Sequence, residues 1–210
     1  MSGCKNGEHT ILNVETNREK YLSFSTNFDR FNAAKKGGFY FECLWILYAM
    51  LEDRTSALLY HLGFTSEQNR NHATGSKNTK KRIRVILKLD NKQQFGFNTI
   101  SKKLKHIEHL LEWAGINPED SLQNDYDKCV HKAMNKLWSQ NKLLPQIVYL
   151  NKEWRLKRNQ LMHELISKNP TDVSGELEPL IEKGYLAMRE IDKAVTSIKK
   201  LNIRQNFRIK

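Results

Sequence analysis

The chain contains few of the residues that interrupt or cross-link a polypeptide: its 210 residues include only 10 Gly, 4 Pro and 3 Cys. Little Gly and Pro, together with abundant Leu, Lys, Glu and Ile, favours helices over a β-sandwich or barrel. The three cysteines, Cys4, Cys43 and Cys129, are odd in number and show no repeated short spacing, which is typical of reduced thiols. We therefore expect an all-α protein in the cytoplasm.

Membrane and targeting signals are also missing. The N-terminal stretch MSGCKNGEHT has no apolar core of the kind that signal peptides carry, and residues 1–10 are expected to form a flexible tail. The most apolar run, FYFECLWILYAML at 39–51, is well short of the roughly 20 residues that span a bilayer. We interpret it as a buried core helix and predict no membrane association.

Sequence motifs of common nucleotide, hydrolase and metal sites are absent. The chain has no G-x-x-x-x-G-K-[ST], G-x-G-x-x-G or G-x-S-x-G, which argues against ordinary ATP, dinucleotide and hydrolase chemistry. His106 and His109, with Cys129 and His131 downstream, lack the paired spacing of a zinc site. We expect neither a metal nor a cofactor.

Positive charge is the strongest compositional feature, since 35 Lys and Arg against 23 Asp and Glu give a formal net charge of +12. Such an excess indicates a polyanionic partner, either nucleic acid or an anionic membrane surface, and the alternative is a basic protein without one. Two basic clusters would suit a phosphate backbone, or are solvated loops: Lys77, Lys80, Lys81, Arg82, Arg84 and Lys199, Lys200, Arg204, Arg208.

Hydrophobic periodicity divides the chain into helices and one polar insertion. Residues 65–81 are almost entirely polar and predict an exposed loop, whereas 82–90 fits either a helix or a strand. The sum is a single domain, 1–210, with the architecture of an up-and-down helical bundle, accessory helices and an insertion around 65–100. Apolar residues at helical spacing predict helices over 14–31, 39–62, 100–114, 120–140, 145–168 and from Ser174 onward.

The segment 145–168 carries the residues of greatest interest. Arg158 falls on its apolar stripe, where a guanidinium needs a partner. The best candidate is Glu52, which interrupts the most hydrophobic helix, with Asp53 second. Arg54 would be a phosphate contact or a solvated charge. His163 lies roughly 140° around the helix from Arg158, so one straight helix does not point both side chains the same way.

The stretch Arg158-Asn159-Gln160-Leu161-Met162-His163 has the form R-N-x-x-x-H and resembles the HEPN superfamily. Members of that superfamily are helical bundles with an R-x4-H motif near a late helix. The resemblance implies a metal-independent endoribonuclease of toxin–antitoxin, abortive-infection or CRISPR-associated systems. It also implies a homodimer whose two chains face their arginines and histidines across one cleft. Toxins paired with nucleotidyltransferase antitoxins usually have a tyrosine where this chain has Leu165.

The chemistry of these residues suits RNA cleavage. Histidine titrates near neutral pH, so His163 can act as base or acid, while Arg158 can hold a phosphate through two hydrogen bonds. Asn159 would orient His163 or donate to a phosphate oxygen. We predict catalysis by Arg158, Asn159 and His163, supported by Glu52, Asp53 and Arg54. RNA contacts are assigned to Lys80, Lys81, Arg82 and Arg84.

The predicted function is therefore cleavage of RNA in defence or toxin-type growth control, with an antitoxin or regulatory protein as a further partner. The alternative is a catalytically silent module of the same type that binds RNA or a partner protein.

Overall fold

The computed structural model describes residues 17–66, 77–87, 96–118, 121–140, 142–164 and 170–209. Within these ranges the chain forms helices and no β-strand, which confirms the predicted all-α class. In chain order the elements are α1 (Asn17–Lys36), α2 (Tyr40–His61), α3 (Lys77–Ile86), α4 (Ile100–Ile116), α5 (Asp125–Ser139), α6 (Leu143–Tyr149), the π-helix η2 (Leu150–Trp154), α7 (Arg155–Glu164), α8 (Pro170–Lys199) and α9 (Ile203–Asn206).

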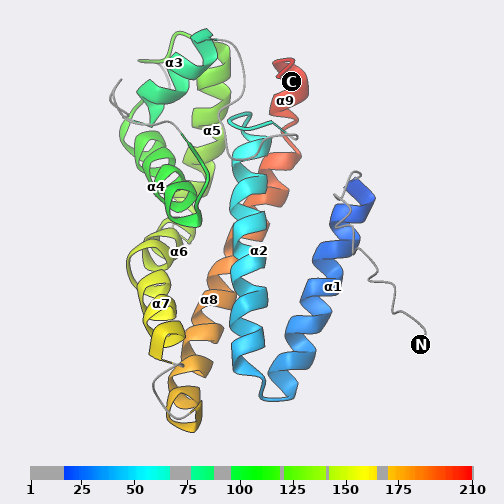
Figure 1. Ribbon diagram of the computed structural model, residues 1–210. Helices are drawn as coiled ribbons and strands as arrows, with labels where there is room; N and C mark the ends of the chain where they lie inside the picture. Colours follow the sequence, from blue (N-terminus) through cyan, green and yellow to red (C-terminus); the bar gives the residue numbers. More distant parts are fainter. Residues whose placement is uncertain are drawn as a thin grey trace, which may run out of the picture.

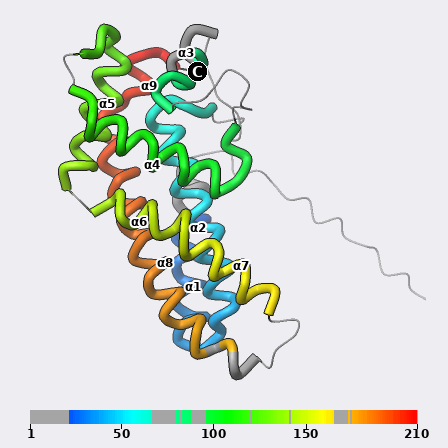
Figure 2. Tube along the Cα trace, turned by 90° about the vertical axis from the view of Figure 1, so that its left-hand side faces the viewer, coloured from blue at the N-terminus to red at the C-terminus, as the bar shows by residue number. Residues whose placement is uncertain are grey.

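Helix α2 lies at the centre of the molecule, with α8 beside it and α1 packed against it (Figures 1 and 2). Helix α1 runs toward one end, α2 returns, the segment α6–η2–α7 runs back, and α8 returns again (Figure 1). Helices α3, α4 and α5 pack together toward the end of the molecule where α2 finishes. Helix α7 is therefore antiparallel to α2.

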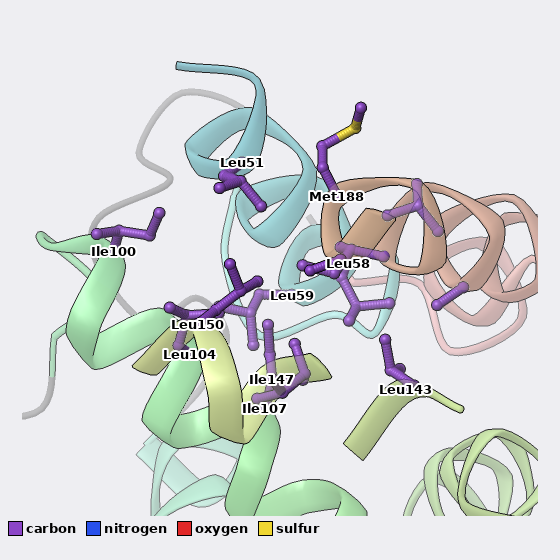
Figure 3. Packing of buried hydrophobic residues seen from close by; sticks show 14 of the residues in the cluster. Leu51, Leu58, Leu59, Ile100, Leu104, Ile107, Leu143, Ile147, Leu150 and Met188 are labelled. Atoms are coloured by element: carbon purple, nitrogen blue, oxygen red, sulfur yellow. The ribbon is translucent and has the colours of Figure 1, made fainter. Parts of the chain in front are cut away.

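The ends of α2 are fixed by glycines whose backbone only glycine adopts without strain. Gly38 has φ +73° in the turn after α1, and Gly63 has φ +88° directly after α2. Between them the buried apolar side chains of α2 face the other helices. Figure 3 shows Leu59 of α2 among Leu104 and Ile107 of α4, Ile147 of α6 and Leu150 of η2. Burying one such side chain stabilises the fold by about 1.5–3 kcal/mol.

Helix α3 replaces part of the predicted loop over 65–81, and it shows that residues 82–86 of the stretch 82–90, which fitted either a helix or a strand, are helical. Ile83, Ile86 and Leu87 share one helical face and are buried, while Val85 is exposed. The alternation that suggested a strand was misleading, because Lys and Arg at the intervening positions are also good helix formers. Residues 67–76, 88–90 and the predicted tail 1–10 lie outside the described ranges.

The predicted single helix over 145–168 is described as far as Glu164, residues 165–168 lying outside the described ranges, and it contains one π-helical turn, η2. A π turn inserts an extra residue into the helix. Here the indole nitrogen of Trp154 donates to the Leu180 carbonyl of α8 at 2.9 Å. Gly184 makes this approach possible, because a Cβ there would collide with the indole. Helix α8 begins at Pro170, a residue suited to the first helical position, so the expectation that this helix starts at Ser174 is wrong.

Three histidines connect helices α4 and α5 to neighbouring backbone. The ring nitrogens of His106, His109 and His131 donate to the carbonyl oxygens of Gly96, Leu87 and Asn117, at 3.4, 3.2 and 2.6 Å. These hydrogen bonds give the three side chains a structural role. Among the described residues, no group of three or more His, Cys, Asp or Glu side chains is placed to hold a metal ion.

Acid should weaken the fold through His106. Burial lowers the pKa of His106 to about 4. In the unfolded chain a histidine titrates near 6.5, so the stabilising contribution is complete above about pH 6.5 and is lost as the pH falls toward 4. The shift corresponds to about 3 kcal/mol in the free energy of unfolding. Urea denaturation across this pH window should give a flatter profile for His106→Gln, which keeps a neutral donor. Superimposable profiles would contradict this assignment.

Candidate functional site

Arg158 is half-buried on α7, and its charge faces two aromatic rings of α2. The guanidinium carbon lies 4.5 Å from the ring centroid of Tyr48 and 5.1 Å from that of Trp45. Its Nη1 donates to the Asn159 side-chain oxygen at 3.1 Å. Guanidinium groups stack favourably on aromatic faces. The arginine on the apolar stripe is therefore stabilised by aromatic faces.

The predicted pairing of Glu52 with Arg158 is wrong. The carboxylate of Glu52 accepts a hydrogen bond from the Lys103 ammonium of α4 at 3.1 Å, and the Lys103 side chain is 2% exposed. A buried ammonium requires a carboxylate more strongly than a guanidinium that already has aromatic faces. Arg158 forms no ion pair within the part of the chain that the structure describes.

Asp53 and Arg54 stabilise the packing of α1 and α8 against α2. The Arg54 guanidinium binds the Asp53 carboxylate, with Nε 3.0 Å from Oδ2, and reaches Asp192 of α8 at 3.2 Å. It also lies 4.0 Å above the Phe24 ring of α1. Arg54 is thus neither a free phosphate contact nor a solvated charge, and the structure does not bring it or Asp53 to Arg158.

Arg155 joins the site, although sequence reasoning missed it. Burial raises the pKa of Tyr48, the Glu52 carboxylate adds to the rise, and Arg158 and Arg155 oppose it. These charges therefore lie near one phenol. The Nε atoms of both arginines are buried without a hydrogen-bond partner among the described residues. The matching three-residue spacings of Arg155 with Arg158 and of Trp45 with Tyr48 were the available signal.

The site has an excess of positive charge. Among the described residues that act on the Tyr48 phenol are two guanidinium groups and one carboxylate, that of Glu52, which Lys103 already binds. An anion with several oxygens, such as a phosphate, would balance this charge and accept hydrogen bonds from the arginines. The guanidinium groups, one of which stacks on the rings of Tyr48 and Trp45, can therefore bind a phosphate group.

His163 and Asn159 occupy the same helix as Arg158. His163 is exposed, whereas Asn159 is half-buried and uses its side-chain oxygen to hold Arg158. Asn159 thus orients the arginine, and the expected contact to His163 is not formed. Both Arg158 and His163 belong to regular α-helix after the π turn, so they remain roughly 140° apart. One chain does not present both to the same point.

The predicted RNA-binding residues lie elsewhere. Lys80 and Lys81 are exposed on α3 and Arg84 is half-buried there, while the side chain of Arg82 lies outside the described part. Helix α3 packs on the end of the molecule where α2 finishes, and α7 lies toward the other end (Figure 1). In the C-terminal cluster, Arg204 donates to the carbonyls of Tyr60, Thr65 and Ile209, which makes it part of the fold.

Searches against protein-family models, curated proteins and solved structures give no significant match to this chain. In the described ranges, no helix is long and apolar enough to cross a membrane. The resemblance to the HEPN superfamily consequently rests on the R-N-x-x-x-H stretch of this sequence.

Proposed function

We propose that this protein is a metal-independent endoribonuclease of the HEPN type, acting in defence or growth control through Arg158, Asn159 and His163. The observation that supports this most is the state of Arg158. Its guanidinium is half-buried, held by Asn159 and two aromatic faces, and has no carboxylate partner among the described residues. A phosphodiester supplies the anion that this arginine lacks.

Cleavage follows from the chemistry of the two side chains, His163 and Arg158. His163 accepts the proton of a ribose 2′-hydroxyl, and the resulting oxygen attacks the adjacent phosphorus. Arg158 stabilises the negative charge that develops on the phosphorane oxygens. The bond from phosphorus to the 5′-oxygen then breaks, and that oxygen takes up a proton from an acid. The products are a 2′,3′-cyclic phosphate and a 5′-hydroxyl.

A second copy of the chain would complete this site. Arg158 turns toward α2, whereas His163 is exposed. The two side chains of one chain therefore do not point at the same phosphate. A two-fold axis beside α7 would bring His163 of the partner subunit to Arg158. The proton donor for the leaving 5′-oxygen would then come from the other histidine of the pair.

The test is cleavage of single-stranded RNA by the purified protein in EDTA. We expect cleavage with 2′,3′-cyclic phosphate or 3′-phosphate ends, and sedimentation of the active species at about twice the chain mass of 24.7 kDa. Loss of cleavage in EDTA with recovery on adding a divalent ion would overturn the mechanism. An active monomer would overturn the composite site, and RNA binding without cleavage would support the catalytically silent module.

A further inference from the structure

Trp45 has an unusual position for its helix. It lies within the most apolar segment of α2, where Leu44, Ile46 and Leu47 are buried, yet it is 57% exposed. Its ring is next to the Arg158 guanidinium, 5.1 Å from centroid to carbon. An open indole surface therefore lies beside a cation that has no carboxylate partner among the described residues.

The order of side chains along the site follows from the helix directions. Helix α7 runs antiparallel to α2 (Figure 1). Arg158 touches both Trp45 and Tyr48, and Arg155, one turn earlier on α7, acts on Tyr48. Residues after Arg158 consequently lie toward the end of α2 that carries Trp45. The indole is thus on the His163 side of the arginine.

We propose that Trp45 stacks on a nucleobase next to the phosphate that Arg158 holds, and that the site consequently takes unpaired RNA. This inference rests on the proposed function for the identity of the ligand and adds the residue that binds the base. A nucleotide combines a phosphate anion with a flat aromatic face, and the site offers a partner for each. In a duplex both faces of a base are covered by its neighbours, so only an unpaired base reaches the indole.

The experiment measures RNA binding by the full chain carrying His163→Ala, which slows cleavage so that binding can be measured on intact RNA. The probes are a short fluorescein-labelled oligoadenylate and a chain of equal length with the same phosphates but abasic riboses. Adding Trp45→Ala should weaken oligoadenylate binding by about 5- to 150-fold, the range of one base stacked on an aromatic ring. Binding of the abasic chain should not change.

Two matched variants separate stacking from a general loss of apolar surface. Trp45→Phe keeps an aromatic face and should retain most of the oligoadenylate affinity. Ile116→Ala removes a side chain that is 71% exposed at the far end of α4, and should leave both affinities unchanged. A duplex of the same sequence should show no dependence on Trp45.

Other roles for Trp45 give different results. Equal weakening for both single-stranded probes would mean that the indole only positions Arg158, and dissociation of a dimer in sedimentation would make it an interface residue. Either result overturns the proposal, as would unchanged affinity or no measurable binding of oligoadenylate. Base-dependent binding by a protein that never cleaves RNA would sustain the stacking role and refute the nuclease. Cleavage without base-dependent binding would do the reverse.

Discussion

Replacing His163 with alanine is expected to lower the rate of RNA cleavage by about 10²- to 10⁴-fold, the usual contribution of a general acid or base. The imidazole is exposed and forms no hydrogen bond or ion pair within the described residues, so the fold does not depend on it. The free energy of unfolding should change by less than about 0.5 kcal/mol, as for other surface substitutions. Single-turnover cleavage and thermal melting of the same preparations measure the two effects.

Gln160→Ala provides the matched control. Gln160 is exposed on the same helix, and its side-chain nitrogen donates to the Glu164 carboxylate, one turn later, at 2.8 Å. Cleavage by this variant should match the parent protein. If both variants cleave RNA at the parental rate, His163 takes no part in the reaction. If both lose activity together with their melting transitions, α7 has been disrupted and the comparison must use His163→Gln.

Features set by neighbouring residues could be predicted from the sequence. The all-α class and the ends of α2 follow from apolar periodicity and from Gly38 and Gly63, whose effects are local. The π turn at Leu150–Trp154 could not be predicted in this way. It depends on the indole of Trp154 meeting the backbone of α8 beside Gly184, a contact between segments that are distant in the sequence.

In the candidate site, too, features within one helix could be predicted, and contacts between helices could not. Arg158, Asn159 and His163 were found because their spacing lies within one helix. The aromatic partners of Arg158 come from α2, where a carboxylate, that of Glu52, was expected because a buried guanidinium is commonly ion-paired. Aromatic faces also stabilise a guanidinium, and Tyr48 and Trp45 provide them. Lysine is almost never fully buried, so the ion pair between the buried Lys103 and Glu52 could not be anticipated.

Removing the Glu52 carboxylate should destabilise the protein by about 3 kcal/mol, the lower end of the effect for breaking a buried pair. The reason is the asymmetry of burial, because the Lys103 side chain is 2% exposed and that of Glu52 is 41% exposed. Glu52→Ala leaves an ammonium buried without its partner, while the lost carboxylate itself was already half in water. Urea denaturation at neutral pH gives the change in the free energy of unfolding.

The origin of that loss can be separated from a loss of packing. Glu52→Leu combined with Lys103→Met replaces the pair by apolar side chains and should recover most of the stability, since no buried charge remains. Glu190→Ala breaks the exposed pair of Glu190 with Lys193 and should cost less than about 1 kcal/mol. If Glu52→Ala leaves the unfolding transition unchanged but abolishes RNA cleavage, Glu52 serves the reaction directly. The buried ammonium would then not be what its carboxylate stabilises.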